Sequence, residues 1–187
     1  MEKKKIAVIN LFILSIIFCS GCTQNIKADA LSRLNYSNRE FGFGLNPPPK
    51  WKLDINKSYD NYAIFNFPQN ESNMFISMSI NASNVNSSET LHSYFDCFIE
   101  ENIQSGKIAN YTLISRADRT FHSPISLIAY ENIYTYTGQV DCVIKVKNLM
   151  IKPKEDVIIC FQFISPFSTY GNYEFDFEFS LSSLTFI

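Results

Sequence analysis

Histidines are the first candidates for chemistry, because imidazole has an ordinary pKa closer to neutral pH than that of other side chains. The chain has two of them, His92 and His122. His92 falls in the first turn of a predicted helix, and His122 precedes a Ser123-Pro124 turn signal. Neither belongs to an HExxH or similar metal-binding motif. We therefore expect ordinary surface or boundary histidines, with neither a metal site nor a catalytic base.

The candidate nucleophiles and acids of the sequence indicate catalysis no more strongly than the histidines do. A cysteine nucleophile needs a nearby histidine, and Cys97 follows His92 by five residues, a spacing that does not place both on one helical face. The sequence has no GxSxG, GxGxxG or P-loop motif. Its carboxylates are scattered, and Glu100-Glu101 is typical of a solvated helix face. We expect no catalytic residue, no enzyme activity and no cofactor; a hydrolase with a dispersed carboxylate pair is the third alternative.

The N-terminus carries an export signal. A basic start at Met1–Lys5 precedes an apolar run of 13 residues, Ile6–Phe18, which is shorter than the roughly 20 residues of a membrane-spanning helix. The sequence Cys19-Ser20-Gly21-Cys22 then resembles a prokaryotic lipobox, although Cys19 stands where leucine is usual. In such signals the last cysteine is lipidated and becomes the new N-terminus. A plain signal peptide cleaved after Gly21, or an uncleaved anchor, is the alternative.

This signal defines the expected organisation of the chain. Residues 1–21 form the signal peptide, residues 22–35 a lipidated N-terminus and tether, and residues 36–187 a single α+β domain. Cleavage removes three lysines and one glutamate from the 16 basic and 18 acidic residues, so the mature chain has a net charge of about −4. That charge argues against nucleic acid as a partner and against binding to anionic lipid heads. Membrane attachment would come from acyl chains on Cys22.

Three cysteines remain in the domain: Cys97, Cys142 and Cys160. They have no CxxC or zinc-ligand spacing among them. A hairpin turn near Pro153–Asp156 would place Cys160 opposite about Leu149, and so not opposite Cys142. We expect three buried free thiols. The alternative is a disulfide that joins Cys97 to Cys142 or to Cys160.

Hydrophobic periodicity predicts strands followed by one helix and then a meander of strands. A stripe of apolar residues from Leu91 to Ile99, which includes Phe98, predicts a helix over Ser88–Ser105 that is capped by Ser87 or Ser88 and ends at Gly106. Residues 173–184 fit both a strand and a helix, because their phenylalanines alternate strictly while other apolar residues follow a helical stripe. The strand-like runs are Tyr59–Phe67, Asn73–Asn81, Tyr111–Thr120, Ser126–Gly138, Gln139–Lys152 and Val157–Ile164, and Arg39–Leu45 is predicted as a loop or edge.

Three tyrosines of one predicted strand, Tyr130, Tyr134 and Tyr136, share the same parity and so line one face of the sheet. If that face is exposed, they form a contact surface for a protein or a glycan. If it is covered, they form the core under the helices, which is the default for a half-buried strand.

The order of elements resembles the PsbP/DcrB-like lipoproteins, a superfamily that also includes Mog1. Phe43-Gly44-Leu45 before Pro47-Pro48-Pro49-Lys50-Trp51 is similar to an early element of that superfamily, and Phe179–Phe186 is similar to its closing helix with a short aromatic tail. The resemblance implies an α+β fold, in which a central antiparallel sheet of about six strands carries a long helix and a C-terminal helix. It also implies an accessory or adaptor role, and no functional residue transfers with it.

We therefore expect a non-catalytic envelope protein, anchored by lipid on Cys22 to the extracytoplasmic face of the cell membrane, that acts through a protein partner in the envelope. The alternative is an extracytoplasmic module that binds a small molecule or a glycan. A protein-binding surface would appear as an exposed apolar patch, and a ligand module as a pocket of about 300 Å³ or more with convergent polar groups.

Overall fold

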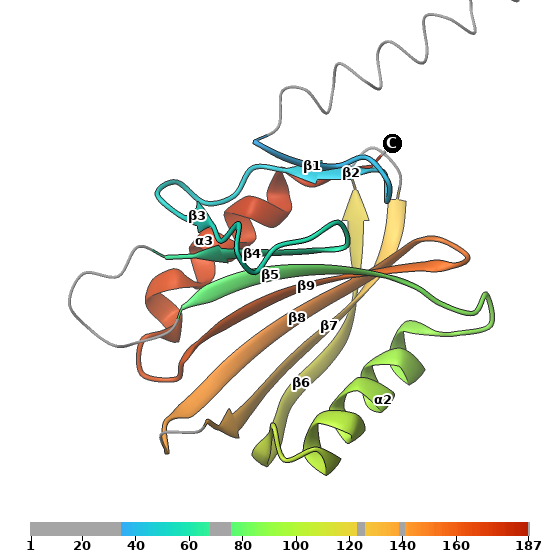
Figure 1. Cartoon of the computed structure of the whole chain (residues 1–187). Coiled ribbons are helices and arrows are strands. Elements are labelled where there is room, and N and C mark those ends of the chain that lie inside the picture. Colours follow the sequence, from blue (N-terminus) through green and yellow to red (C-terminus); the bar gives the residue numbers. More distant parts are fainter. Residues whose placement is uncertain (1–34, 68–75, 123–125, 139–140, 187) are drawn as a thin grey trace, which may run out of the picture.

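A computed structural model describes residues 35–67, 76–122, 126–138 and 141–186 (Figure 1). The predicted signal peptide, Cys22 and residues 23–34 of the predicted tether lie outside the described residues. Within these ranges the chain forms a seven-stranded sheet, a three-stranded sheet and two helices. The elements are β1 (Tyr36–Asn38), β2 (Phe43–Leu45), β3 (Lys52–Leu53), β4 (Tyr62–Asn66), β5 (Ser77–Asn84), α2 (Leu91–Gln104), β6 (Ala109–His122), β7 (Ser126–Thr137), β8 (Val143–Lys154), β9 (Val157–Pro166), α3 (Tyr170–Ser182) and β10 (Thr185–Phe186).

The large sheet is antiparallel and has the order β3-β4-β5-β9-β8-β7-β6 (Figure 1). The predicted meander is confirmed by the successive pairing of β6, β7, β8 and β9. The described sheet has one strand more than the expected six, and the two-residue β3 at its edge is too short to give a periodic signal. The small sheet has the order β1-β2-β10, so the end of the domain closes against its beginning.

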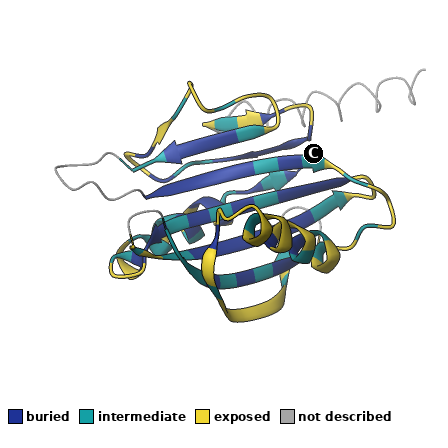
Figure 2. Ribbon diagram, turned by 60° about the horizontal axis from the view of Figure 1, so that its bottom comes forward, coloured by how far each residue is buried: buried dark blue, intermediate teal, exposed yellow. Residues whose placement is uncertain are grey.

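The two helices cover opposite faces of the large sheet. Alternate residues of a strand point to opposite faces. Phe161 and Phe163 of β9 therefore pack in one core cluster with Phe177 of α3, whereas Ile158 packs in a second cluster with Phe95 of α2. Burial colours in Figure 2 follow this arrangement, with the buried residues concentrated in the inner strands. Because both faces of β9 are covered, the middle of the sheet is buried on both sides.

Helix α2 begins later than predicted. Thr90, and neither Ser87 nor Ser88, is its N-cap, because the Thr90 side chain accepts a 3.1 Å hydrogen bond from the Ser93 backbone N–H while Ser93 Oγ accepts one from the Thr90 N–H. The predicted end at Gly106 is confirmed, and this glycine has a φ of 72°. The apolar stripe is only partly buried: Phe95 is fully buried, but Phe98 is 37% exposed.

The ambiguous C-terminal segment is helix α3, followed by the short strand β10, which is what the family resemblance implied. A helix has 3.6 residues per turn, so residues two apart lie on nearly opposite sides. Phe177 accordingly has no exposed surface, whereas Phe175 and Phe179 are 77% and 44% exposed. The strict alternation of phenylalanines therefore marks the two sides of one helix.

Candidate functional site

The three tyrosines of β7 lie under a helix, as the default interpretation expected, and the alternative of an exposed contact surface at Tyr130, Tyr134 and Tyr136 is wrong. Tyr130 and Tyr134 are 4% and 1% exposed, and their rings pack against Phe95 of α2 at centroid distances of 6.2 and 5.9 Å. Tyr136 is half-buried beside them, 6.4 Å from Tyr134. Helix α2 covers this face of the sheet, so these tyrosines belong to the core rather than to an exposed contact surface.

The predicted position of His92 in the first turn of α2 is confirmed, and its ring contributes to packing. Its Nε2 lies 3.3 Å from Asp118 Oδ1 on β6, and the ring packs against the Tyr130 ring at a centroid distance of 3.9 Å, tilted by 33°. A second pair, Arg116 with Asp96 at 2.7 Å, joins the same helix to β6. His122 ends β6 and does not lie in a turn. These pairs hold α2 at the edge of the sheet.

The cysteines are free thiols, but only in part as predicted. Cys97 is exposed on α2, which corrects the expected burial, while Cys142 and Cys160 are half-buried. Cys160 lies opposite Met150, one residue from the predicted position, because the β8–β9 register shifts between Ile151 and Lys154. Burial raises the pKa of the Cys160 thiol to about 12, so this thiol stays protonated and is a poor nucleophile at neutral pH.

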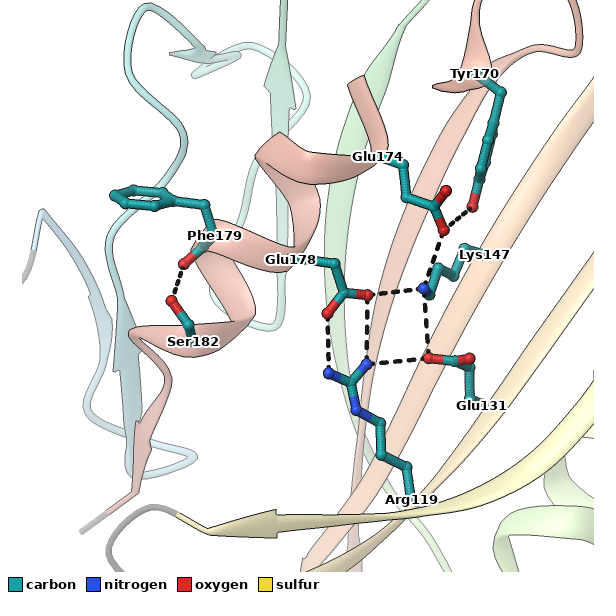
Figure 3. Close-up of polar contacts among 8 residues, drawn as sticks. All are labelled: Arg119, Glu131, Lys147, Tyr170, Glu174, Glu178, Phe179 and Ser182. Atoms are coloured by element: carbon teal, nitrogen blue, oxygen red, sulfur yellow. Dashed lines mark hydrogen bonds and ion pairs between the residues drawn. The ribbon is translucent and has the colours of Figure 1, made fainter. Parts of the chain in front are cut away.

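A cluster of five charged side chains lies between α3 and the sheet (Figure 3). Lys147 of β8 is its centre, with 8% of its side chain exposed and three carboxylates at 2.7 to 3.5 Å from Nζ. Arg119 of β6 makes hydrogen bonds of 3.3 and 2.9 Å to the two oxygens of Glu178. The cluster consists of Arg119, Glu131, Lys147, Glu174 and Glu178.

The charges of this cluster support one another. Burial alone would raise the pKa of Glu178, but hydrogen bonds from Arg119 and Lys147 outweigh it and lower the pKa below its ordinary value. Burial would likewise lower the pKa of Lys147, and the surrounding carboxylates raise it instead. A glycosidase acid needs a raised carboxyl pKa, which Glu178 does not have. The cluster therefore fastens α3 to the sheet, and Glu178 is held in its charged form.

This cluster was not predicted from the sequence. Its members are up to 59 residues apart, as Arg119 and Glu178 are, and each alone is an ordinary charged residue. A weak signal exists in the spacing of Glu174 and Glu178, which places both on one side of a helix. Only the register of β6, β7 and β8 brings the other three members under that side.

The face under α2 carries a row of polar side chains that runs across five strands. The pairing registers place Arg116, Asn132, Asn148, Gln162 and Ser79 side by side in that order. Asn132 and Asn148 are 0% and 1% exposed, although asparagine is seldom fully buried. Asn148, Gln162 and Ser79 line a cleft of about 240 Å³ between the sheet and α2.

Helix α3 presents an aromatic surface on the side that faces away from the sheet. We call Phe175 and Phe179 the α3 aromatic face; they are one helical turn apart, and both are exposed. Figure 3 shows the Phe179 ring on the opposite side of α3 from the charged cluster. Trp51 Nε1 donates a 3.0 Å hydrogen bond to Asp176 of the same helix, so α3 is fixed from more than one direction.

The part of the chain that the structure describes lacks both metal-ligand clusters and membrane-spanning helices. In that part of the chain, no group of three or more histidine, cysteine, aspartate or glutamate side chains is arranged to hold a metal ion. Nor does it contain a helix that is both long and apolar enough to span a bilayer.

No protein-family model matches the sequence, and no curated protein sequence matches it. Solved structures do match. Cyanobacterial PsbP (CyanoP) from Synechocystis has a TM-score of 0.56 and 15% identity, over 81% of this chain and 91% of that chain. A Pseudomonas aeruginosa protein of unknown function has a TM-score of 0.52 and 12% identity, over 68% of this chain and 91% of that one.

The Ran-binding protein Mog1p of Saccharomyces cerevisiae also matches, with a TM-score of 0.50 and 7% identity over 75% of this chain and 81% of Mog1p. Identities this low show the fold and nothing about shared activity. The seven-stranded antiparallel sheet, the long helix and the C-terminal helix of the described residues agree with these structures. The chain therefore has the PsbP/Mog1-like α+β fold, as the resemblance in its sequence predicted.

Proposed function

We propose that this protein is a lipid-anchored accessory protein of the cell envelope that acts through protein contacts. Residues 1–21 serve as a signal peptide, lipid on Cys22 holds the protein to the extracytoplasmic face of the membrane, and the segment up to residue 35 is a tether. The lipobox-like Cys19-Ser20-Gly21-Cys22 supports the location. The fold is shared with a Ran-binding protein, which is consistent with a role in binding proteins.

The α3 aromatic face is the observation that carries the proposed contact. Exposed phenylalanines lose unfavourable contact with water when a partner covers them, and aromatic residues are enriched in the energetically dominant centre of protein interfaces. The charged cluster and the Trp51–Asp176 hydrogen bond fix α3 to the rest of the domain. Binding to a helix that is already fixed costs less conformational entropy than binding to a mobile one.

Strand addition is a less suitable mode of contact for this fold. The edge strand β6 has register irregularities at Ala109/Thr112 and Leu113/Ser115, and bulges at a sheet edge oppose pairing with a further strand. The other edge, β3, has two residues and offers little backbone for a ladder. A helix face is thus the better docking surface of the described domain.

Lipid attachment is tested at Cys22. We expect mass spectrometry of protein extracted from its own membranes to find an N-terminal peptide that begins at a diacylglyceryl-modified Cys22. The Cys22→Ser variant should lose this modification and keep residues 1–21, because the thiol that accepts the lipid is absent. Cys142→Ser, which changes a half-buried cysteine near the β7–β8 turn, is the control and should be lipidated normally. A wild-type chain that keeps Met1, or that starts at Cys22 without lipid, would contradict the anchor.

The protein contact is tested by photo-crosslinking in intact cells. We expect p-benzoylphenylalanine in place of Phe175 to give a discrete crosslinked product at least fivefold more abundant than the same group in place of Glu100. Both positions are exposed on helices, but Glu100 lies on α2 at the other face of the sheet. Equal yields at the two positions would show that the α3 aromatic face is not the contact surface, whatever the lipid state of Cys22.

A further inference from the structure

The cleft under α2 combines an apolar wall with a polar floor. Helix α2 supplies Tyr94, Phe95 and Phe98, and the sheet supplies the polar row with Asn148 and Gln162 at the cleft. Phe98 is 37% exposed, so the cleft reaches the surface along the helix. An arrangement of aromatic rings against a few fixed polar groups is typical of a small-molecule site.

The polar floor has hydrogen-bonding capacity that the fold leaves unused. Both side-chain amide atoms of Asn132 and the Nδ2 of Asn148 are buried and make no regular hydrogen bond among the described residues, although an interaction of Asn148 with the Tyr134 hydroxyl opposes the rise in the Tyr134 pKa that burial causes. The Oδ1 of Asn148 accepts a weak 3.8 Å contact from the Cys160 thiol. Buried amides without partners lower stability, and native proteins keep few of them. Asn148 is one of the residues that line the cleft, so its amide is the closest of these buried polar groups to any molecule bound there.

The chemistry of the lining restricts the ligand. None of the described residues that line the cleft is an aspartate, glutamate, lysine, arginine or histidine. Burial holds the Cys160 thiol protonated, and desolvation raises the pKa of Tyr62, so these groups add no negative charge at neutral pH. A charged ligand would lose its hydration without gaining a counter-charge, which is unfavourable. The cleft therefore fits an uncharged ligand.

Size and hydrogen bonding restrict it further. A volume of about 240 Å³ is below the range of roughly 300–1,000 Å³ typical of sites for drug-sized ligands, so a single ring is the appropriate size. An amide side chain both donates and accepts hydrogen bonds, and it is best satisfied by a ligand edge that does the same. The aromatic rings of α2 would cover the flat face of such a ring.

We propose that the cleft between α2 and the sheet binds an uncharged single-ring molecule whose edge both donates and accepts hydrogen bonds, with Asn148 and Gln162 reading that edge and Phe98 covering its face. A monosaccharide unit and a nucleobase share this chemistry. The site is separate from the α3 aromatic face, because the two lie on opposite faces of the sheet. Loss of either would leave the other intact.

The test uses matched neutral and charged probes. Glucose is compared with glucuronate, and uracil with orotate, by NMR of ¹⁵N-labelled protein that begins after residue 22 and contains the whole described domain. We expect one neutral member to shift the side-chain amide signals of Asn148 with a dissociation constant on the order of a millimolar or lower, and its charged counterpart to bind at least tenfold more weakly. If glucose binds, the site takes a sugar; if uracil binds, it takes a nucleobase.

Two variants locate the site. Asn148→Leu removes the buried amide, so we expect the Tm to rise by about 3 °C while affinity for the neutral probe falls at least tenfold. Phe98→Ala changes a partly exposed residue of the helix wall and should lower affinity about fivefold in a folded protein. Asn172→Leu, at an exposed position on α3, is the matched control and should leave binding unchanged.

Several outcomes would overturn the proposal. One is that neither neutral probe shifts the Asn148 signals at 20 mM, which is about twentyfold above the expected dissociation constant. Another is equal binding of a neutral probe and its charged counterpart. A third is a loss of stability in Asn148→Leu with binding unchanged, which would assign the amide row to the structure of the core alone.

Discussion

Lys147→Met is expected to lower the free energy of unfolding by about 3 kcal/mol. Lys147 is nearly buried and lies 2.7, 3.2 and 3.5 Å from Glu178, Glu174 and Glu131. Methionine has a similar length but no charge, so three carboxylates would be left with Arg119 as their remaining cation. Removing one partner of a buried ion pair costs about 3–5 kcal/mol, and the partial exposure of the carboxylates places this case at the lower end. Urea unfolding followed by fluorescence of the single tryptophan, Trp51, measures the change.

The pH dependence separates charge from packing in this variant. The pKa of Glu178 is lowered below its ordinary value of 4.5, so its stabilising effect is complete above that pH and is lost as the pH falls through the lowered pKa. The difference between wild type and Lys147→Met should therefore shrink as the pH falls from about 5 to about 3. Lys52→Met, at an exposed position on β3, should change stability by less than about 0.5 kcal/mol at either pH.

A loss that stays constant across this pH range would show that methionine disturbs packing and that the ion pairs contribute little. A second substitution tests the electrostatic coupling in the cluster independently of the pH dependence. Adding Glu131→Gln to Lys147→Met removes one of the uncompensated charges, so the double variant should recover part of the lost stability. Additive losses in the double variant would contradict electrostatic coupling between these two residues.

Much of the fold could be predicted because hydrophobic periodicity and turn-forming residues depend only on residues that are close together in the sequence. The β8–β9 hairpin was placed to within one residue, and the remaining error has a physical cause. Pro153 has no backbone N–H to donate, and the register shift between Ile151 and Lys154 moves Cys160 from Leu149 to Met150. A shift of one residue exchanges the faces of a strand, so a small local irregularity decides which core a side chain joins.

The functional features depend on register and could not be predicted in the same way. Asn132, Asn148 and Gln162 are polar residues in three different predicted strands, and each alone is unremarkable in sequence. They form a row only because β7, β8 and β9 pair at Asn132↔Asn148 and Asn148↔Gln162. The charged cluster arises in the same manner on the opposite face. Without the register, the sequence gives no signal for the polar row and only the helical spacing of Glu174 and Glu178 for the charged cluster.

The tyrosines of β7 show what residue parity in a strand does not predict. Parity correctly indicated that Tyr130, Tyr134 and Tyr136 share one face of the sheet, but parity does not say which element covers that face. Helix α2 covers it, and Phe95 fills the space between Tyr130 and Tyr134. Two of the exposed aromatic residues, Phe175 and Phe179, are on α3, in the segment whose period fitted both a strand and a helix. The helical conformation of this segment therefore determines where the proposed contact surface lies.

Phe177→Ala is expected to lower the free energy of unfolding by about 3–5 kcal/mol, the usual cost of truncating a buried phenylalanine. Phe177 has no exposed surface, and its ring stacks on Phe163 at a centroid distance of 5.7 Å. Phe175→Ala is the matched control, because the same side chain two residues earlier is 77% exposed; it should cost less than about 0.5 kcal/mol. A strand would place both rings on one face and make the two losses alike in urea unfolding. Only a helix, with Phe177 inward and Phe175 outward, makes them differ.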